Sequence, residues 1–200
     1  VILRSLFARS SAIPRIIMQK NAELGRSDTG ARNEATQRSH IPKCMNFFWS
    51  DTPMSWIRYL TIYSFRHLNP DWSIILHICK AQKHSRPWHT REVQDCGNYA
   101  GKDYLERVSM LDIKIQEWSP PFGNLPPAHA SDFFQWELLS TEGGFYSDMD
   151  ILFTRPLPYR EWKQKDTIYC NSKGNMSIGF LAASARNPLF HAVNEEALKS

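Results

Sequence analysis

Short apolar runs alternate with amphipathic stretches along most of the chain. Runs at 44–49 and 74–78 are typical of buried strands, whereas residues 54–68 place their apolar side chains on one helical face. Strands that alternate with helices predict an α/β domain with a mostly parallel sheet. The further predicted elements are strands within 108–115, 145–153, 168–170 and 180–183, and helices at 131–141 and 188–199.

The first forty residues differ from the rest of the chain. They hold seven Lys or Arg and three acidic residues, which accounts for the whole formal charge of +4, and Phe7 is their only aromatic Phe, Trp or Tyr. A segment this poor in large apolar groups buries too little surface to offset about 1–2 kcal/mol of backbone entropy per ordered residue. We therefore expect residues 1–40 to be a basic, largely disordered segment and residues 41–200 to form the domain.

The composition excludes several classes of protein. At 200 residues, 42% hydrophobic and 22% charged, the chain is neither fully disordered nor collagen-like. It has no run of roughly 18 uncharged apolar residues of the kind that a membrane-spanning helix needs. The four cysteines form no C-x-x-C pair, so we expect reduced thiols and a cytoplasmic protein. A Golgi enzyme whose N-terminal anchor is missing would look similar.

Two aspartates mark the candidate chemistry. If residues 145–153 form a strand, Tyr146, Asp148 and Asp150 point to one face, near the end of the sheet where α/β proteins bind ligands. Two carboxylates this close repel each other unless a cation holds them, and oxygen ligands suit Mg²⁺ or Mn²⁺. Chance predicts roughly half an Asp-x-Asp match in a chain of this length and composition, so the context of the triplet must decide.

That context is a series of short motifs in a fixed order. They are Ile41-Pro42-Lys43, Trp49, Asn69-Pro70-Asp71-Trp72, Ser131-Asp132, Gly143-Gly144, Tyr146, Asp148 and Asp150. Over about residues 41–190, their order and spacing resemble those of the DXD-containing sugar transferase family. That family includes capsular polysaccharide transferases, yeast-type initiating mannosyltransferases and, more distantly, the large clostridial glucosylating toxins.

The resemblance implies a GT-A-like, Rossmann-like fold with helices flanking the sheet. It also implies a metal-dependent, retaining hexosyltransferase that uses Mn²⁺ or Mg²⁺ and a UDP- or GDP-linked sugar donor. The acceptor would be a hydroxyl of a glycan, polysaccharide or lipid-linked molecule, as in polysaccharide biosynthesis, with possible peripheral membrane association. Because such domains are longer, the catalytic domain is expected to be C-terminally incomplete.

Residue roles follow from the same resemblance. Asp150 would ligate the metal, and Asp148 would contact the ribose or the water shell of the metal. Asp132 would hold the ribose or the donor sugar, Trp49 would stack on the nucleobase, and Tyr146 would lie beside the diphosphate. Two of these residues also have ordinary structural interpretations, because Trp49 suits an apolar core and Asp132 suits the first turn of a helix.

One departure from the family pattern concerns Gln135, which stands where the family usually has arginine. Glutamine can hydrogen-bond a sugar hydroxyl but supplies no charge. An inactive protein that still binds sugar nucleotides therefore remains an alternative. The others are a metal-dependent phosphohydrolase and a protein that binds nucleic acid through its basic arm. The last is disfavoured because residues 41–200 carry no net charge.

Overall fold

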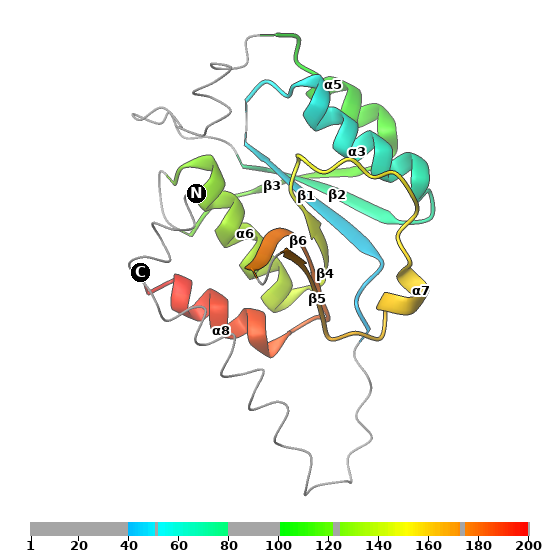
Figure 1. The fold of residues 1–200 in the computed structure, drawn as a ribbon. Coiled ribbons are helices and arrows are strands. Elements are labelled where there is room, and N and C mark those ends of the chain that lie inside the picture. The colour runs from blue at the N-terminus through cyan, green and yellow to red at the C-terminus, as the bar shows by residue number, and fades with distance from the viewer. Residues whose placement is uncertain (1–39, 51, 80–100, 122–124, 173–174, 200) are drawn as a thin grey trace, which may run out of the picture.

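A computed structural model describes most of the predicted domain (Figure 1). The described residues are 40–50, 52–79, 101–121, 125–172 and 175–199. Residues 1–39 lie outside them, so the disorder expected for the basic N-terminal segment stays a prediction.

The centre of the fold is one six-stranded sheet with the strand order β3-β2-β1-β4-β6-β5. β1 pairs in parallel with β2 and β4, and β2 pairs in parallel with β3. β6 runs antiparallel to both β4 and β5, so the sheet is mixed. The strands are β1 (Cys44–Ser50), β2 (Ser73–Cys79), β3 (Lys114–Trp118), β4 (Gly144–Ser147), β5 (Thr167–Ser172) and β6 (Asn175–Ala183).

Helices cover both faces of this sheet (Figure 1). On one face, α3 packs on Met45 and Phe47 of β1. On the other face, α6 packs on Phe48 of β1 and Tyr146 of β4, and α8 lies beside α6. The helices are α3 (Trp56–Leu68), α5 (Leu105–Val108), η1 (Ser109–Leu111, a 3₁₀ turn), α6 (Pro127–Thr141), α7 (Tyr159–Trp162) and α8 (Pro188–Ala197).

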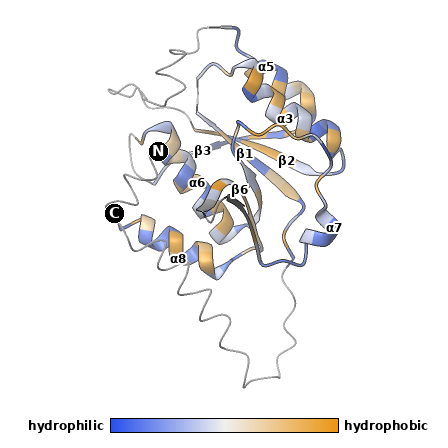
Figure 2. Cartoon of the chain, viewed as in Figure 1, coloured by the Kyte–Doolittle hydropathy of each residue, from blue (hydrophilic) through white to orange (hydrophobic). Residues whose placement is uncertain are grey.

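The alternation of side chains along β1 explains this three-layer packing. Successive residues of a strand point to opposite faces, so Met45 and Phe47 join one core while Phe48 joins the other. Both faces of the central strands therefore contribute buried apolar side chains, as expected for strands that lie between helices. The helices α3 and α8 carry both hydrophobic and hydrophilic residues (Figure 2), whereas α6 is buried more widely because it packs on the sheet and on α8. Among the described residues, no helix combines the length and apolarity needed to cross a membrane.

A row of polar side chains crosses the sheet beneath α6. The Gln116 side-chain amide donates to His77 Nδ1 at 2.9 Å, and so His77 Nε2 carries the ring proton and donates to Asn46 Oδ1 at 3.0 Å. Asn46 in turn donates to the Phe145 carbonyl oxygen at 3.1 Å. Burial, helped by the charge of Lys114, lowers the pKa of His77 to about 4, so the ring is neutral at physiological pH.

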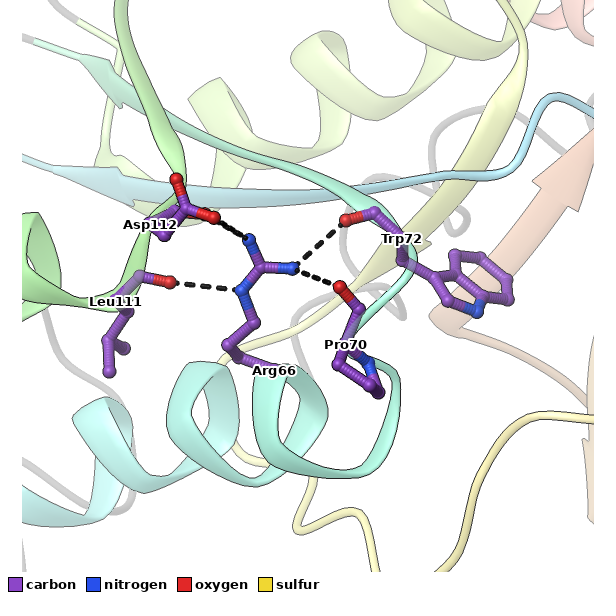
Figure 3. Close-up of polar contacts among 5 residues, drawn as sticks. All are labelled: Arg66, Pro70, Trp72, Leu111 and Asp112. Atoms are coloured by element: carbon purple, nitrogen blue, oxygen red, sulfur yellow. Dashed lines mark hydrogen bonds and ion pairs between the residues drawn. The ribbon is translucent and has the colours of Figure 1, made fainter.

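The strand predicted within 108–115 is largely wrong. Residues up to Leu111 are helical, and β3 begins only at Lys114. The change follows from Arg66 on α3, whose guanidinium donates to the carbonyl oxygens of Pro70, Trp72 and Leu111 and pairs with the Asp112 carboxylate (Figure 3). Asp112 adopts a left-handed backbone with a φ of 50°, which ends the helical turns there.

Candidate active site

The candidate site forms where the N-terminal half of α6 meets the C-terminal end of β4. Tyr146 is 1% exposed and points from β4 toward α6. Its hydroxyl donates to Asp148 Oδ1 at 2.9 Å and lies 2.6 Å from Ser131 Oγ. Since the phenol has one proton, Ser131 donates to it. The result is a directed chain of hydrogen bonds that runs from α6 through Tyr146 to the Asp148 carboxylate.

The prediction that Tyr146, Asp148 and Asp150 share one strand face is wrong. β4 ends at Ser147, and Asp150 lies in a turn, exposed to solvent, whereas Asp148 is half-buried.

The reason is that the chain after β4 forms hydrogen bonds with α3 and so leaves the sheet. Thr61 Oγ1 donates to the Met149 carbonyl oxygen at 2.9 Å, and the Phe153 N–H donates to Ser64 Oγ at 3.2 Å. The segment that follows Asp148 therefore runs alongside α3 instead of extending β4. Asp148 remains hydrogen-bonded to the sheet, whereas Asp150 lies outside the sheet. The Asp150 carboxylate is therefore exposed and accessible to a ligand.

Two carboxyl groups of the cluster are electrostatically strained. Burial, together with the charge of Asp148, raises the pKa of Asp132 to about 7. Burial and the charge of Asp150 raise the pKa of Asp148 to about 6, although the Tyr146 hydrogen bond and the charge of Arg58 act in the opposite direction. Burial also raises the pKa of Tyr146 well above its usual value, so its hydroxyl stays protonated. Burial, more than any other cause, therefore disfavours the ionised form of both carboxyl groups.

Gln135 lies one turn further along α6 and is 1% exposed. Its amide nitrogen donates to Asp132 Oδ1 at 3.1 Å. Its amide oxygen is buried and has no hydrogen-bond partner among the described residues. A buried acceptor without a donor costs about 1–3 kcal/mol, so a ligand hydroxyl that reached this oxygen would relieve that cost.

Trp49 is placed separately from this cluster. It lies at the C-terminal end of β1, half-buried against the core on the α3 side, and its indole N–H donates to the Thr52 carbonyl oxygen at 2.8 Å. The described contacts of Trp49 do not join it to Asp132 or Tyr146. Trp49 and the cluster nevertheless lie at the same end of the sheet. β1 and β4 run in parallel, and Phe47 is in register with Ser147.

The residues present suit a divalent cation of the Mg²⁺ or Mn²⁺ type. Within the described ranges, no three His, Cys, Asp or Glu side chains come together as a closed metal site. These ions, however, often bind through one or two carboxylates and take their other ligands from water and phosphate. Asp148, whose charge is poorly compensated, and the exposed Asp150 form a donor set of this kind.

Sequence reasoning did not single out Ser131 or Gly179 as site residues. Ser131 holds Tyr146, and the carbonyl oxygen of Gly179 accepts the Asp148 N–H at 2.8 Å. The available signals were the position of Ser131 beside Asp132 and an isolated glycine inside a strand pattern, which often marks a close approach.

Comparisons with known proteins address the family and the fold of the chain. The profile of a family described as "Glycosyltransferase sugar-binding region containing DXD motif" matches residues 53–169, whereas no curated protein sequence matches the chain. Among solved structures, the PaToxG glycosyltransferase superposes with a TM-score of 0.56 at 16% identity, covering 98% of this chain and 70% of that one. The ligand-free glycosyltransferase domain from the YGT toxin gives 0.51 at 12% identity, covering 80% of this chain and 63% of that one.

At such low identities the two structures establish the fold, which is of the GT-A type. The profile match covers more than half of the chain and includes Asp132, Asp148 and Asp150. The chain therefore belongs to the glycosyltransferase family whose sugar-binding region contains the DXD motif.

Proposed function

We propose that this chain is a metal-dependent, retaining hexosyltransferase that uses a UDP- or GDP-linked donor and a glycan or lipid-linked acceptor. The observation that carries the proposal is the closely spaced pair Asp132 and Asp148, whose pKa values are raised mainly by burial, next to the exposed Asp150. Such a cluster needs a cation, and a Mn²⁺- or Mg²⁺-bound sugar diphosphate brings one. Family membership supplies the reaction class.

Each side chain has a defined task in this proposal. Asp148 and Asp150 would hold the metal, which when bound stabilises the charge that develops on the departing diphosphate. Tyr146 donates to Asp148 Oδ1 and so fixes the direction of that carboxylate. Asp132 would accept hydrogen bonds from the ribose or the donor sugar. A retaining transfer needs no separate base if the leaving phosphate accepts the proton of the acceptor hydroxyl.

Gln135 adds no charge to the proposed donor site. Its unpartnered amide oxygen is an acceptor for a sugar hydroxyl, and its nitrogen is already committed to Asp132. We therefore propose a donor with a neutral hexose, because glutamine offers no charge for an acidic sugar. The free thiols of Cys44 and Cys79 support a reducing, cytoplasmic location.

The test is a donor titration with the full chain. UDP-glucose, UDP-galactose and GDP-mannose are added with and without Mn²⁺, and both binding and nucleotide release are measured. We expect binding and release that depend on the metal for one of these donors. Binding without release identifies an inactive sugar-nucleotide-binding protein, and release of inorganic phosphate identifies a phosphohydrolase. Salt-sensitive binding of nucleic acid instead of the donors contradicts the proposal.

Trp49→Ala is expected to weaken UDP or GDP binding by about tenfold, since base stacking on an aromatic ring contributes roughly 1–3 kcal/mol. Trp49→Phe retains an aromatic face and should lose less. Isothermal titration in the presence of Mn²⁺ measures both, and pyrophosphate, which has no base, is the control ligand. A loss of pyrophosphate affinity equal to the loss of nucleotide affinity would show that Trp49 only supports the core.

A further inference from the structure

Gly179 of β6 lies directly against the Asp148 carboxylate. β6 pairs antiparallel with β4, with Phe180 opposite Ser147. Just beyond this pair, the Asp148 N–H donates to the Gly179 carbonyl oxygen at 2.8 Å. A β-carbon placed on Gly179 would stand 3.0 Å from Asp148 Oδ2 and 3.7 Å from its Cγ. Only a residue without a side chain leaves the carboxylate where it is.

The backbone does not explain this glycine. Gly143 and Gly144 have φ values of 71° and 102°, which suit glycine, whereas Gly179 has no such positive φ. Within a strand, glycine is less favourable than alanine because it loses more backbone entropy on folding. Considered by itself, the strand would therefore gain stability from alanine at position 179. The requirement for glycine comes from the space that Asp148 occupies.

The carboxylate cannot simply move aside. Its other oxygen, Oδ1, accepts the hydrogen bond from Tyr146 at 2.9 Å, and Tyr146 is itself held by Ser131. The backbone of Asp148 is anchored to β6 as well. A side chain at position 179 would therefore push Oδ2 away and lengthen or break the Tyr146 contact. Metal–ligand distances in well-formed sites lie within about 0.2 Å of their typical values, so a carboxylate displaced by more than this would be a poorer ligand.

We infer that Gly179 is a positioning residue, because its missing side chain fixes the orientation of the Asp148 carboxylate. This inference rests on the proposed function only where it links that orientation to metal and donor binding. Its structural part, the contact between position 179 and Asp148, stands independently and is tested separately below.

The functional test is Gly179→Ala, with Gly101→Ala as the matched control in an exposed bend. Mn²⁺ affinity in the presence of the nucleotide should fall by about tenfold and turnover by about a hundredfold, the size of effect that a small misplacement of a reacting group produces. Gly101→Ala should change neither. Unchanged Mn²⁺ affinity in Gly179→Ala would overturn the link to the metal site.

The structural test is a double-mutant cycle measured by urea unfolding without metal. Gly179→Ala should lower the unfolding midpoint of the wild-type chain but raise it in an Asp148→Ala background, where the β-carbon has room. If only the double variant can be purified, the contact is likewise supported. The inference is overturned if Gly179→Ala shifts the unfolding midpoint equally in both backgrounds. It is also overturned if neither Gly179→Ala nor the double variant can be purified. If the wild-type chain shows no Mn²⁺-dependent donor binding, only the proposed function is overturned.

Discussion

Replacing Asp150 by alanine is expected to reduce Mn²⁺-dependent nucleotide release by about a thousandfold. Asp150 is the exposed carboxylate of the pair, so its removal takes away the proposed metal ligand without disturbing the buried contacts of Tyr146 and Asp148. Metal stabilisation of a leaving group contributes several kcal/mol, and about 1.4 kcal/mol corresponds to each tenfold change in rate. Steady-state nucleotide release at saturating donor measures the effect.

The matched control is Asp166→Ala. Asp166 is also exposed, but it lies at the opposite edge of the sheet, beside the end of β6. This variant should keep wild-type turnover, and chelation of the metal in the wild type should reproduce the Asp150→Ala defect. Equal turnover in wild type and Asp150→Ala, or full activity in excess chelator, would contradict the assignment of the metal site.

The sequence predicted those elements that local pattern determines. The apolar runs at β1 and β2 and the amphipathic stretch at α3 were located to within about two residues. The helix predicted at 131–141 ends where the sequence places it, because the Gly143 N–H donates to the Leu138 carbonyl oxygen at 2.9 Å and the φ of Gly143 is 71°. For each of these elements, the residues that determine the local structure are close together in the sequence.

Prediction failed where contacts from distant parts of the chain override local preference. The apolar residues at 108–115 fit a strand, but Arg66 binds carbonyl oxygens there and stabilises helical turns. Residues 145–153 also fit a strand, but hydrogen bonds with Thr61, which donates, and Ser64, which accepts, hold the second half along α3. Neither arrangement can be inferred from residues close in sequence.

The candidate site shows the same division. The resemblance to a known family named Asp132, Tyr146 and Asp148 together, and the structure places them in one cluster. The resemblance did not show that Ser131 and Tyr146 orient the Asp148 carboxylate, because that orientation depends on the packing of α6 on β4. It also did not identify Gly179, whose role arises only when β6 pairs beside β4.

Without metal, the chain should lose stability as the pH rises from about 5 to 8. The folded-state pKa values of Asp132 and Asp148, about 7 and about 6, lie above the ordinary value of 3.8. Between pH 3.8 and about pH 7 the folded chain retains protons that the unfolded chain has released. The free energy of unfolding therefore falls as the pH rises and is lowest above pH 7. Partial exposure and mutual coupling reduce the effect to about 3 kcal/mol. Urea unfolding at several pH values measures it.

Asp132→Asn isolates the contribution of one group, because the amide keeps the shape of the side chain but cannot ionise. This comparison is needed because His77, whose folded pKa is about 4, makes the opposite contribution below its usual value of 6.5. The variant should be more stable than wild type at pH 8 by about 1–2 kcal/mol, this advantage should shrink to less than half at pH 5, and it should vanish below about pH 3.8. Asp166→Asn, at an exposed site, should match the wild type at both values. Mn²⁺ with nucleotide should reverse the wild-type trend, since a bound cation favours ionised carboxylates. An Asp132→Asn profile parallel to that of the wild type would show that Asp132 does not carry the charge imbalance of the site.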